Sequence, residues 1–181
     1  MTKFDDLVSD VMRQSRCSLK VFGPMQAPDR VEIEFHGPCA RIPAHKNQRI
    51  HGTNIIRPEA KAVLVAMTKL IRQAVPPNYT LQFPKAEQVL CFVHCGNRDG
   101  RSFDVDNVIT TVKDWLEPSF IRKRERGWGI GLVENDRYVK GDGDIKGPGF
   151  ESTMIVVVPR RGEVEAMYSK YTNFILTQAG L

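Results

Sequence analysis

Hydrophobic residues recur at helical spacing in some stretches of the chain and at strand spacing in others. The helical stretches, each with one apolar face, are residues 3–14, 59–74, 108–117 and 164–175. The strand candidates are residues 31–36, 87–94 and 154–158, the last being an unbroken apolar run typical of a buried central strand. This mixture predicts an α/β (α+β) fold in which a small mixed sheet is flanked by amphipathic helices.

Glycine and proline mark the expected breaks between these elements. Gly23-Pro24 and Ala27-Pro28 indicate a linker, so we expect residues 1–30 to form an amino-terminal helix and linker. Residues 31–181 would then form the main domain. A chain of 181 residues is long enough for one domain with a real core and too short for two comfortable ones.

The sequence predicts three different segments between the third helix and the last strand. Residues 119–126 form either a helical extension or an exposed basic arm. Residues 130–133 and 137–140 can pair as a hairpin, which places Asp136 near the start of a strand. Residues 141–149 are rich in glycine and predict a mobile loop.

Composition excludes several classes of protein. Hydrophobic residues make up 41% of the chain, and no apolar run approaches the roughly 20 residues needed to cross a bilayer. The first residues lack the features of a secretion signal, and the four cysteines are unevenly spaced. We therefore expect a soluble cytoplasmic protein with reduced thiols and no contact with membranes.

The charge of the chain favours an anionic partner. The net charge is +5, and basic residues gather in several short groups, which is typical of a surface that binds nucleic acid. The candidate nucleic-acid-binding residues are Lys46, Arg49, Arg57, Arg122, Lys123, Arg124 and Arg126.

The strongest candidate for chemistry is the motif Asp104-Val105-Asp106-Asn107, which immediately precedes the third helix. Two aspartates two positions apart share a face only where the chain is extended. Carboxylates held that close repel one another unless a proton or cation lies between them, and hard oxygen ligands favour Mg²⁺ or Mn²⁺. The alternative is structural: Asp106 caps the helix and Asp104 is solvated.

These residues resemble the RusA family of Holliday junction resolvases, which are crossover junction endodeoxyribonucleases. The resemblance covers about residues 31–158. It is carried by Asp104-Val105-Asp106-Asn107, Asp114, Asn135-Asp136-Arg137-Tyr138-Val139, Gly37-Pro38, Lys46, Arg49 and Pro58-Glu59. It implies a homodimer that binds four-way DNA junctions and makes paired symmetric nicks with Mg²⁺ or Mn²⁺. It also implies that Asp104, Asp106 and Asp136 bind the metal and act in catalysis.

One departure concerns the lysine that the family has four residues after the second aspartate. That position is Thr110 here. Lys113 lies one turn further along roughly the same helical face, so we expect it to act as the catalytic lysine. Lys140 or Lys146 could compensate instead.

Two other groups of residues are given no chemistry. Cys91, His94 and Cys95 cannot meet on one zinc ion if they lie on a strand, because the cysteines are ~13 Å apart and the histidine points the other way. We therefore expect core thiols. Asp142 and Asp144 are expected to be solvated, although one could be a further metal ligand.

The sequence thus supports a metal-dependent, structure-selective DNA endonuclease that resolves four-way junctions. The first alternative is a branched-DNA-binding protein with weak or no catalysis, suggested by Thr110. A second alternative is a nuclease that acts on flaps or other branched DNA.

Overall fold

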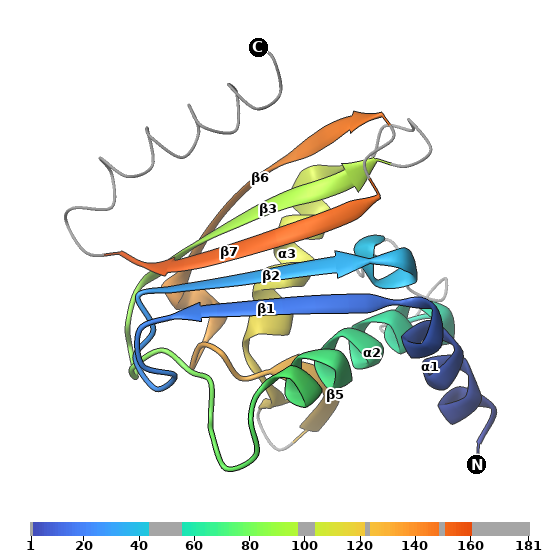
Figure 1. Ribbon diagram of the computed structural model, residues 1–181, viewed down its shortest axis with the longest axis horizontal. Helices are drawn as coiled ribbons and strands as arrows, with labels where there is room; N and C mark the ends of the chain where they lie inside the picture. Colours follow the sequence, from blue (N-terminus) through green and yellow to red (C-terminus); the bar gives the residue numbers. More distant parts are fainter. Residues whose placement is uncertain (1, 44–55, 98–103, 122–123, 149–150, 161–181) are drawn as a thin grey trace.

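Five strands form one mixed sheet in the computed structural model, which describes residues 2–43, 56–97, 104–121, 124–148 and 151–160 (Figure 1). The strands follow the order β1-β2-β7-β3-β6 across the sheet. Their bounds are β1 Arg16–Phe22, β2 Arg30–His36, β3 Val89–Asn97, β6 Val139–Pro148 and β7 Ser152–Pro159. The fold is therefore mixed α+β, as the spacing of hydrophobic residues predicted.

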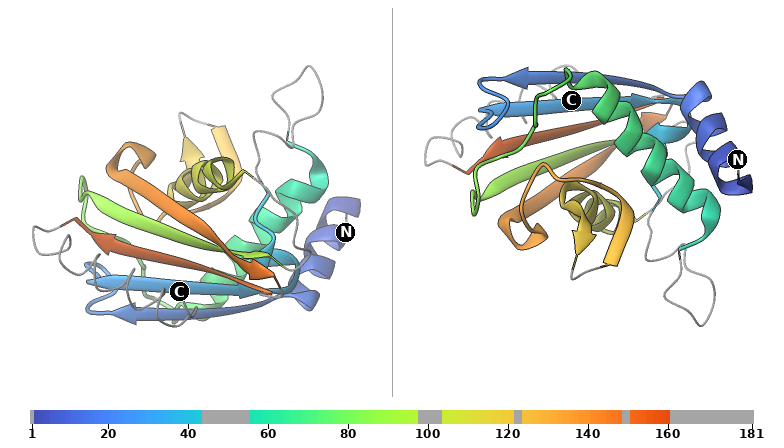
Figure 2. Two further views of the ribbon diagram at one scale, coloured as in Figure 1. Left: turned by 90° about the horizontal axis from the view of Figure 1, so that it is seen from above. Right: turned by 90° about the horizontal axis from the view of Figure 1, so that it is seen from below.

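The described part of the chain has three α-helices; the second and third lie on one side of this sheet, and the first packs against the second at the end of the sheet (Figure 2). They are α1 Lys3–Gln14, α2 Pro58–Ala74 and α3 Val105–Leu116. Helices α1 and α2 match expected helices to within one residue, and Pro58 opens α2 as expected. Helix α3 begins at Val105, three residues before its expected start. The fourth expected helix, over residues 164–175, lies outside the described residues. Among those that are described, no helix is long and apolar enough to cross a membrane.

The core lies between the sheet and these helices. Val31, Ile33 and Phe35 are 0% exposed, as the alternation in β2 predicted. They face the same side as Ile155 and Val157 of β7, which pairs with β2 on one side and β3 on the other. The expectation that residues 154–158 form a buried central strand is therefore confirmed.

Strand β1 lies where the sequence indicated only the end of a helix and a linker. Residues 16–22 pair antiparallel with β2, from Arg16 opposite His36 to Phe22 opposite Arg30. The expected linker is the turn of this hairpin, where Gly23 has a φ of +85° that favours glycine. Residue 30 therefore lies inside a β-hairpin, and residues 16–22 belong to the same sheet as the rest of the domain.

The segment after α3 is a separate two-stranded hairpin, of β4 Pro118–Ile121 and β5 Arg124–Ile130. Of the two alternatives for residues 119–126, the helical extension is therefore wrong. The expected pairing of residues 130–133 with 137–140 is also wrong, because Ile130 pairs with Pro118. A short 3-10 helix, η2 Asp136–Tyr138, then leads into β6.

Strand β6 replaces the expected glycine-rich loop over residues 141–149. It pairs parallel with β3, with Val89 opposite Val139. The glycines are explained by the packing of α3: a Cβ on Gly141 would lie 2.5 Å from Ile109 Cγ2, and one on Gly143 would lie 2.5 Å from the Val93 carbonyl oxygen. These glycines therefore allow close approach of a helix to a strand.

Candidate functional site

Asp104 and Asp106 lie at the amino-terminal end of α3. Asp104 is the N-cap: its carboxylate accepts hydrogen bonds from the backbone N–H of Asn107 at 3.3 Å and from the Asn107 side chain. Asp106 lies in the first turn and is exposed. The capping aspartate is thus Asp104 and not Asp106, and the helix begins between the two rather than after both.

Thr110, at the position where the RusA family has lysine, lies one helical turn after Asp106. Its hydroxyl donates a hydrogen bond of 2.9 Å to the backbone carbonyl of Asp106. This contact supplies no positive charge. The cation nearest in sequence on α3 is Lys113, whose side chain lies against β6, since a Cβ on Gly141 would lie 3.4 Å from Lys113 Cδ.

Asp136 lies at the other end of α3. Its backbone N–H donates a hydrogen bond of 2.6 Å to the carboxylate of Glu117, the C-cap residue of α3. The helix has 12 residues, which corresponds to a length of about 18 Å. The structure therefore separates Asp136 from Asp104 and Asp106 by roughly the length of the helix.

The connection between two parallel strands gives the physical reason for this separation. β3 and β6 run in the same direction, so α3 must return from the carboxyl end of β3 to the amino end of β6. Asp104 and Asp106 precede this return, whereas Asp136 follows it. Within the described residues of one chain, no group of three histidine, cysteine, aspartate or glutamate residues could hold a metal ion.

The candidate nucleic-acid-binding residues are only partly described. Arg57 is exposed at the N-cap of α2. Arg124 and Arg126 lie in β5, but their side chains fall outside the described residues. Lys46, Arg49, Arg122 and Lys123 lie wholly outside the described residues. The basic arm expected from the sequence is thus in part a β-hairpin.

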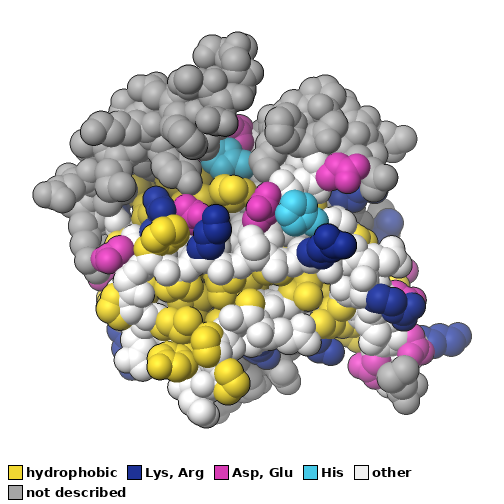
Figure 3. Space-filling model, viewed as in Figure 1, with side chains coloured by type: hydrophobic (Ala, Val, Ile, Leu, Met, Phe, Trp, Pro, Cys, Tyr) yellow, Lys and Arg dark blue, Asp and Glu magenta, His cyan; other side chains and the backbone are white. Residues whose placement is uncertain are grey.

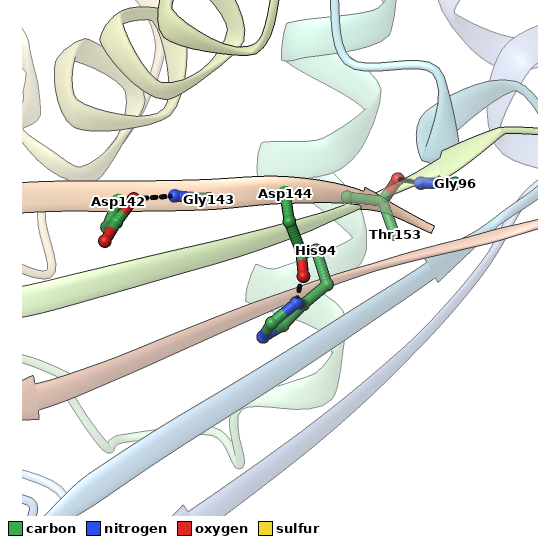
Figure 4. Close-up of polar contacts among 6 residues, drawn as sticks. All are labelled: His94, Gly96, Asp142, Gly143, Asp144 and Thr153. Atoms are coloured by element: carbon green, nitrogen blue, oxygen red, sulfur yellow. Dashed lines mark hydrogen bonds and ion pairs between the residues drawn. The ribbon is translucent and has the colours of Figure 1, made fainter. Parts of the chain in front are cut away.

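The structure brings together one polar pair to which the sequence assigned no role. His94 of β3 and Asp144 of β6 point toward one another, with 2.5 Å between His94 Nδ1 and Asp144 Oδ1 (Figure 4). Both lie on the sheet face opposite α3. Charged side chains form a row across this face beside hydrophobic ones (Figure 3). A strand over residues 139–148 places Asp142 and Asp144 on one face. Only the parallel register that sets His94 opposite Asp144 identifies the pair, and that register is not visible in the sequence.

The cysteines are core residues, as expected. Cys91 is 0% exposed and Cys95 is 3% exposed, while His94 faces the other side of the sheet. Burial raises the pKa of Cys91 to about 12, although the nearby Lys113 ammonium lowers it. This thiol is therefore protonated near neutral pH.

No protein-family model, curated protein or solved structure matches this chain. The resemblance to the RusA family therefore depends on the motif residues themselves.

Proposed function

We propose that this protein is a metal-dependent, structure-selective DNA endonuclease that resolves four-way junctions by paired nicks. The observation that supports the proposal best is the pair of carboxylates at the exposed amino-terminal end of α3, Asp104 and Asp106, in an Asp-x-Asp-Asn motif. Carboxylate oxygens are the ligands that Mg²⁺ and Mn²⁺ prefer, and such an ion can activate water and stabilise charge on a phosphate.

The charge of the chain supports a nucleic-acid substrate. The net charge of +5 favours binding to the DNA backbone. Arg57 contributes an exposed guanidinium at the N-cap of α2, and guanidinium groups suit phosphate recognition.

The resemblance implies that three carboxylates bind Mg²⁺ or Mn²⁺, but within a single chain these three carboxylates lie too far apart to share one ion. One chain offers Asp104 and Asp106 together, with Asp136 at the far end of α3. A nuclease of this kind therefore needs either a site with two carboxylates or a third carboxylate from elsewhere.

The direct test is a nicking assay on a synthetic four-way junction, a flap and a linear duplex, with Mg²⁺, with Mn²⁺ and with a chelator. We expect metal-dependent nicking of the junction by the natural protein. Asp106→Asn should lose nicking by about 100-fold or more while junction binding is retained. Asp10→Asn, which changes another exposed aspartate on α1, is the matched control and should nick normally. Undiminished cleavage by the Asp106→Asn variant would contradict the proposal.

A second candidate function is a branched-DNA-binding protein without catalysis. It is favoured by Thr110, whose hydroxyl bonds to the helix backbone where the family has a lysine, and by the separation of Asp136. Such a protein would bind junctions with an affinity that falls steeply with salt, as counterions are released. Neither metal would yield product. Manganese-dependent nicking by the purified natural protein would exclude it.

A further inference from the structure

An apolar patch lies on the face of the sheet that points away from α2 and α3. Along β3 and β7, the side chains on this face alternate with those that enter the core. The antiparallel register of the two strands places them in adjacent rows, with Val158 opposite Leu90 and Val156 opposite Phe92. We call this surface the outer patch; it consists of Leu90, Phe92, Met154, Val156 and Val158.

Two residues of the outer patch are buried. Leu90 is 7% exposed and Val156 is 3% exposed, although both point away from the core between the sheet and the helices. Within the described part of the chain, no helix or hairpin lies over this face (Figure 2). An apolar sheet face is stable when a second layer covers it. The outer patch therefore needs a cover from outside the described residues.

The chain leaves the sheet beside the outer patch. The backbone N–H of Arg160, which follows β7, donates a hydrogen bond of 2.6 Å to the backbone carbonyl of Gln88. The Arg160 guanidinium also donates to the Gln88 side chain at 3.3 Å. These two contacts fix the point from which residues 161–181, which lie outside the described residues, continue.

We propose that the helix predicted over residues 164–175 packs on the outer patch and runs back along β7. Only residues 161–163 separate Arg160 from its expected start, and three residues span at most about 10 Å. The helix therefore begins close to the end of β7. The opposite face of this strand is already occupied, because Ile155 and Val157 are 0% exposed within the core.

The apolar stripe of this helix matches the outer patch in length. The stripe is formed by Val164, Met167, Tyr168, Tyr171, Phe174 and Ile175. It spans about 16 Å along the helix axis, and the outer patch spans about 13 Å from Val158 to Met154. Docking gives the sheet a helical layer on each face, which buries both of its sides.

The charges beside the outer patch also fit this helix. Glu32 of β2 is level with the middle row of the patch, and Lys140 of β6 is level with the row at the end of β7. A right-handed helix that runs back along β7 with its stripe on the sheet turns Lys170 toward β2 and Glu165 toward β6. Each of these two side chains is thus carried toward the opposite charge.

Limited proteolysis of the full chain tests whether the stripe is buried. Trypsin cuts after Lys170, and mass spectrometry identifies this cut. Met167→Asp places a charge in the stripe and should speed the cut about tenfold or more, because proteolysis follows the population of the opened state. Ala166→Asp is the matched control: it introduces the same charge one residue away, on the polar side of the helix, and should leave the rate unchanged.

A double-variant cycle tests whether the stripe meets the outer patch. In the proposed arrangement Tyr168 lies over Phe92, so Phe92→Ala and Tyr168→Ala should each lower the urea midpoint of unfolding. The double variant should lose less than the sum of the two single losses, because the two side chains contact each other. Asn173→Ala, on the polar side of the helix, is the control and should combine additively with Phe92→Ala.

Three outcomes would overturn the proposal. The first is equal cleavage of the Met167→Asp and Ala166→Asp variants, or cleavage of the natural protein after Lys170 as fast as in the urea-unfolded chain. The second is additive losses for Phe92 and Tyr168. The third is protection of Lys170 that disappears on dilution, which would show that the helix of a second copy covers the patch. These measurements need neither DNA nor metal, so their outcome is independent of the proposed function.

Discussion

The carboxylate of Glu117 accepts a hydrogen bond of 2.6 Å from the backbone N–H of Asp136. This contact joins the carboxyl-terminal end of α3 to the segment that enters β6. It fixes Asp136 far from the other two motif aspartates, and Glu117 is only 2% exposed. The position of Asp136 is therefore set by a buried acceptor rather than by a shared metal site within one chain.

The first prediction concerns this acceptor. Glu117→Ala should lower the free energy of unfolding by about 1–3 kcal/mol, because a partly buried N–H loses its acceptor. Glu117→Gln keeps an acceptor oxygen and should lose less. Urea unfolding monitored by circular dichroism would measure both. Glu134→Ala is the control, since Glu134 accepts from the exposed Ala86 N–H at 3.2 Å. An equal loss in Glu134→Ala would contradict the special role of Glu117.

A second prediction separates the structural role of Asp104 from its charge. Asp104→Ala removes the N-cap of α3 and should cost about 1 kcal/mol, whereas Asp104→Asn retains a capping oxygen and should cost much less. Thermal unfolding would measure the difference. If the carboxylate charge is required for nicking, both variants should lose nicking activity, although only Asp104→Ala should lose stability. Active Asp104→Asn protein would indicate that the side chain is only a cap.

A third prediction tests the contact of α3 with β6. Gly141→Ala should cost about 1–3 kcal/mol, because the new Cβ overlaps Ile109 Cγ2. Ile109→Ala removes that methyl group, so the loss in the double variant should be smaller than the sum of the two single losses. Gly143→Ala should not be relieved in the same way, because its Cβ meets the carbonyl oxygen of Val93. Additive losses for Gly141 and Ile109 would contradict this packing.

A fourth prediction concerns the cysteines. Burial raises the pKa of Cys17 and of Cys91 to about 12 and that of Cys39 to about 11. These thiols should react slowly with Ellman's reagent at pH 8 in the folded protein and rapidly in urea. Fast labelling of Cys39 or Cys91 in the folded protein would contradict their burial.

The raised pKa values of these three thiols make the stability of the folded protein depend on pH. The folded protein holds these protons more tightly than the unfolded chain, whose thiols titrate near pH 9. The stabilisation is therefore complete below pH 9 and is lost as pH rises from 9 toward 12. Urea midpoints measured over this range should fall, and replacement of Cys91 by Ala should reduce the slope.

The spacing of hydrophobic residues was sufficient to predict the helices and strands in which it matches the buried side chains. The apolar stripes of α1, α2 and α3, the alternation in β2 and the apolar run in β7 each reflect which side chains leave water. The sequence predicted a loop where β6 lies, because glycine is rare in strands. The glycines of β6 are explained by the close contact with Ile109, which the local sequence does not indicate.

The composition and motif of the chain also indicated an acidic centre in a basic protein, but not its geometry. Whether Asp136 meets Asp104 depends on which strands pair and in which direction. That choice is made by contacts between residues far apart in sequence, such as Val89 with Val139 and Ile109 with Gly141. The sequence by itself therefore identified the candidate acidic residues. The distances between them were determined by the tertiary structure, because β3 and β6 pair in parallel and α3 must connect them.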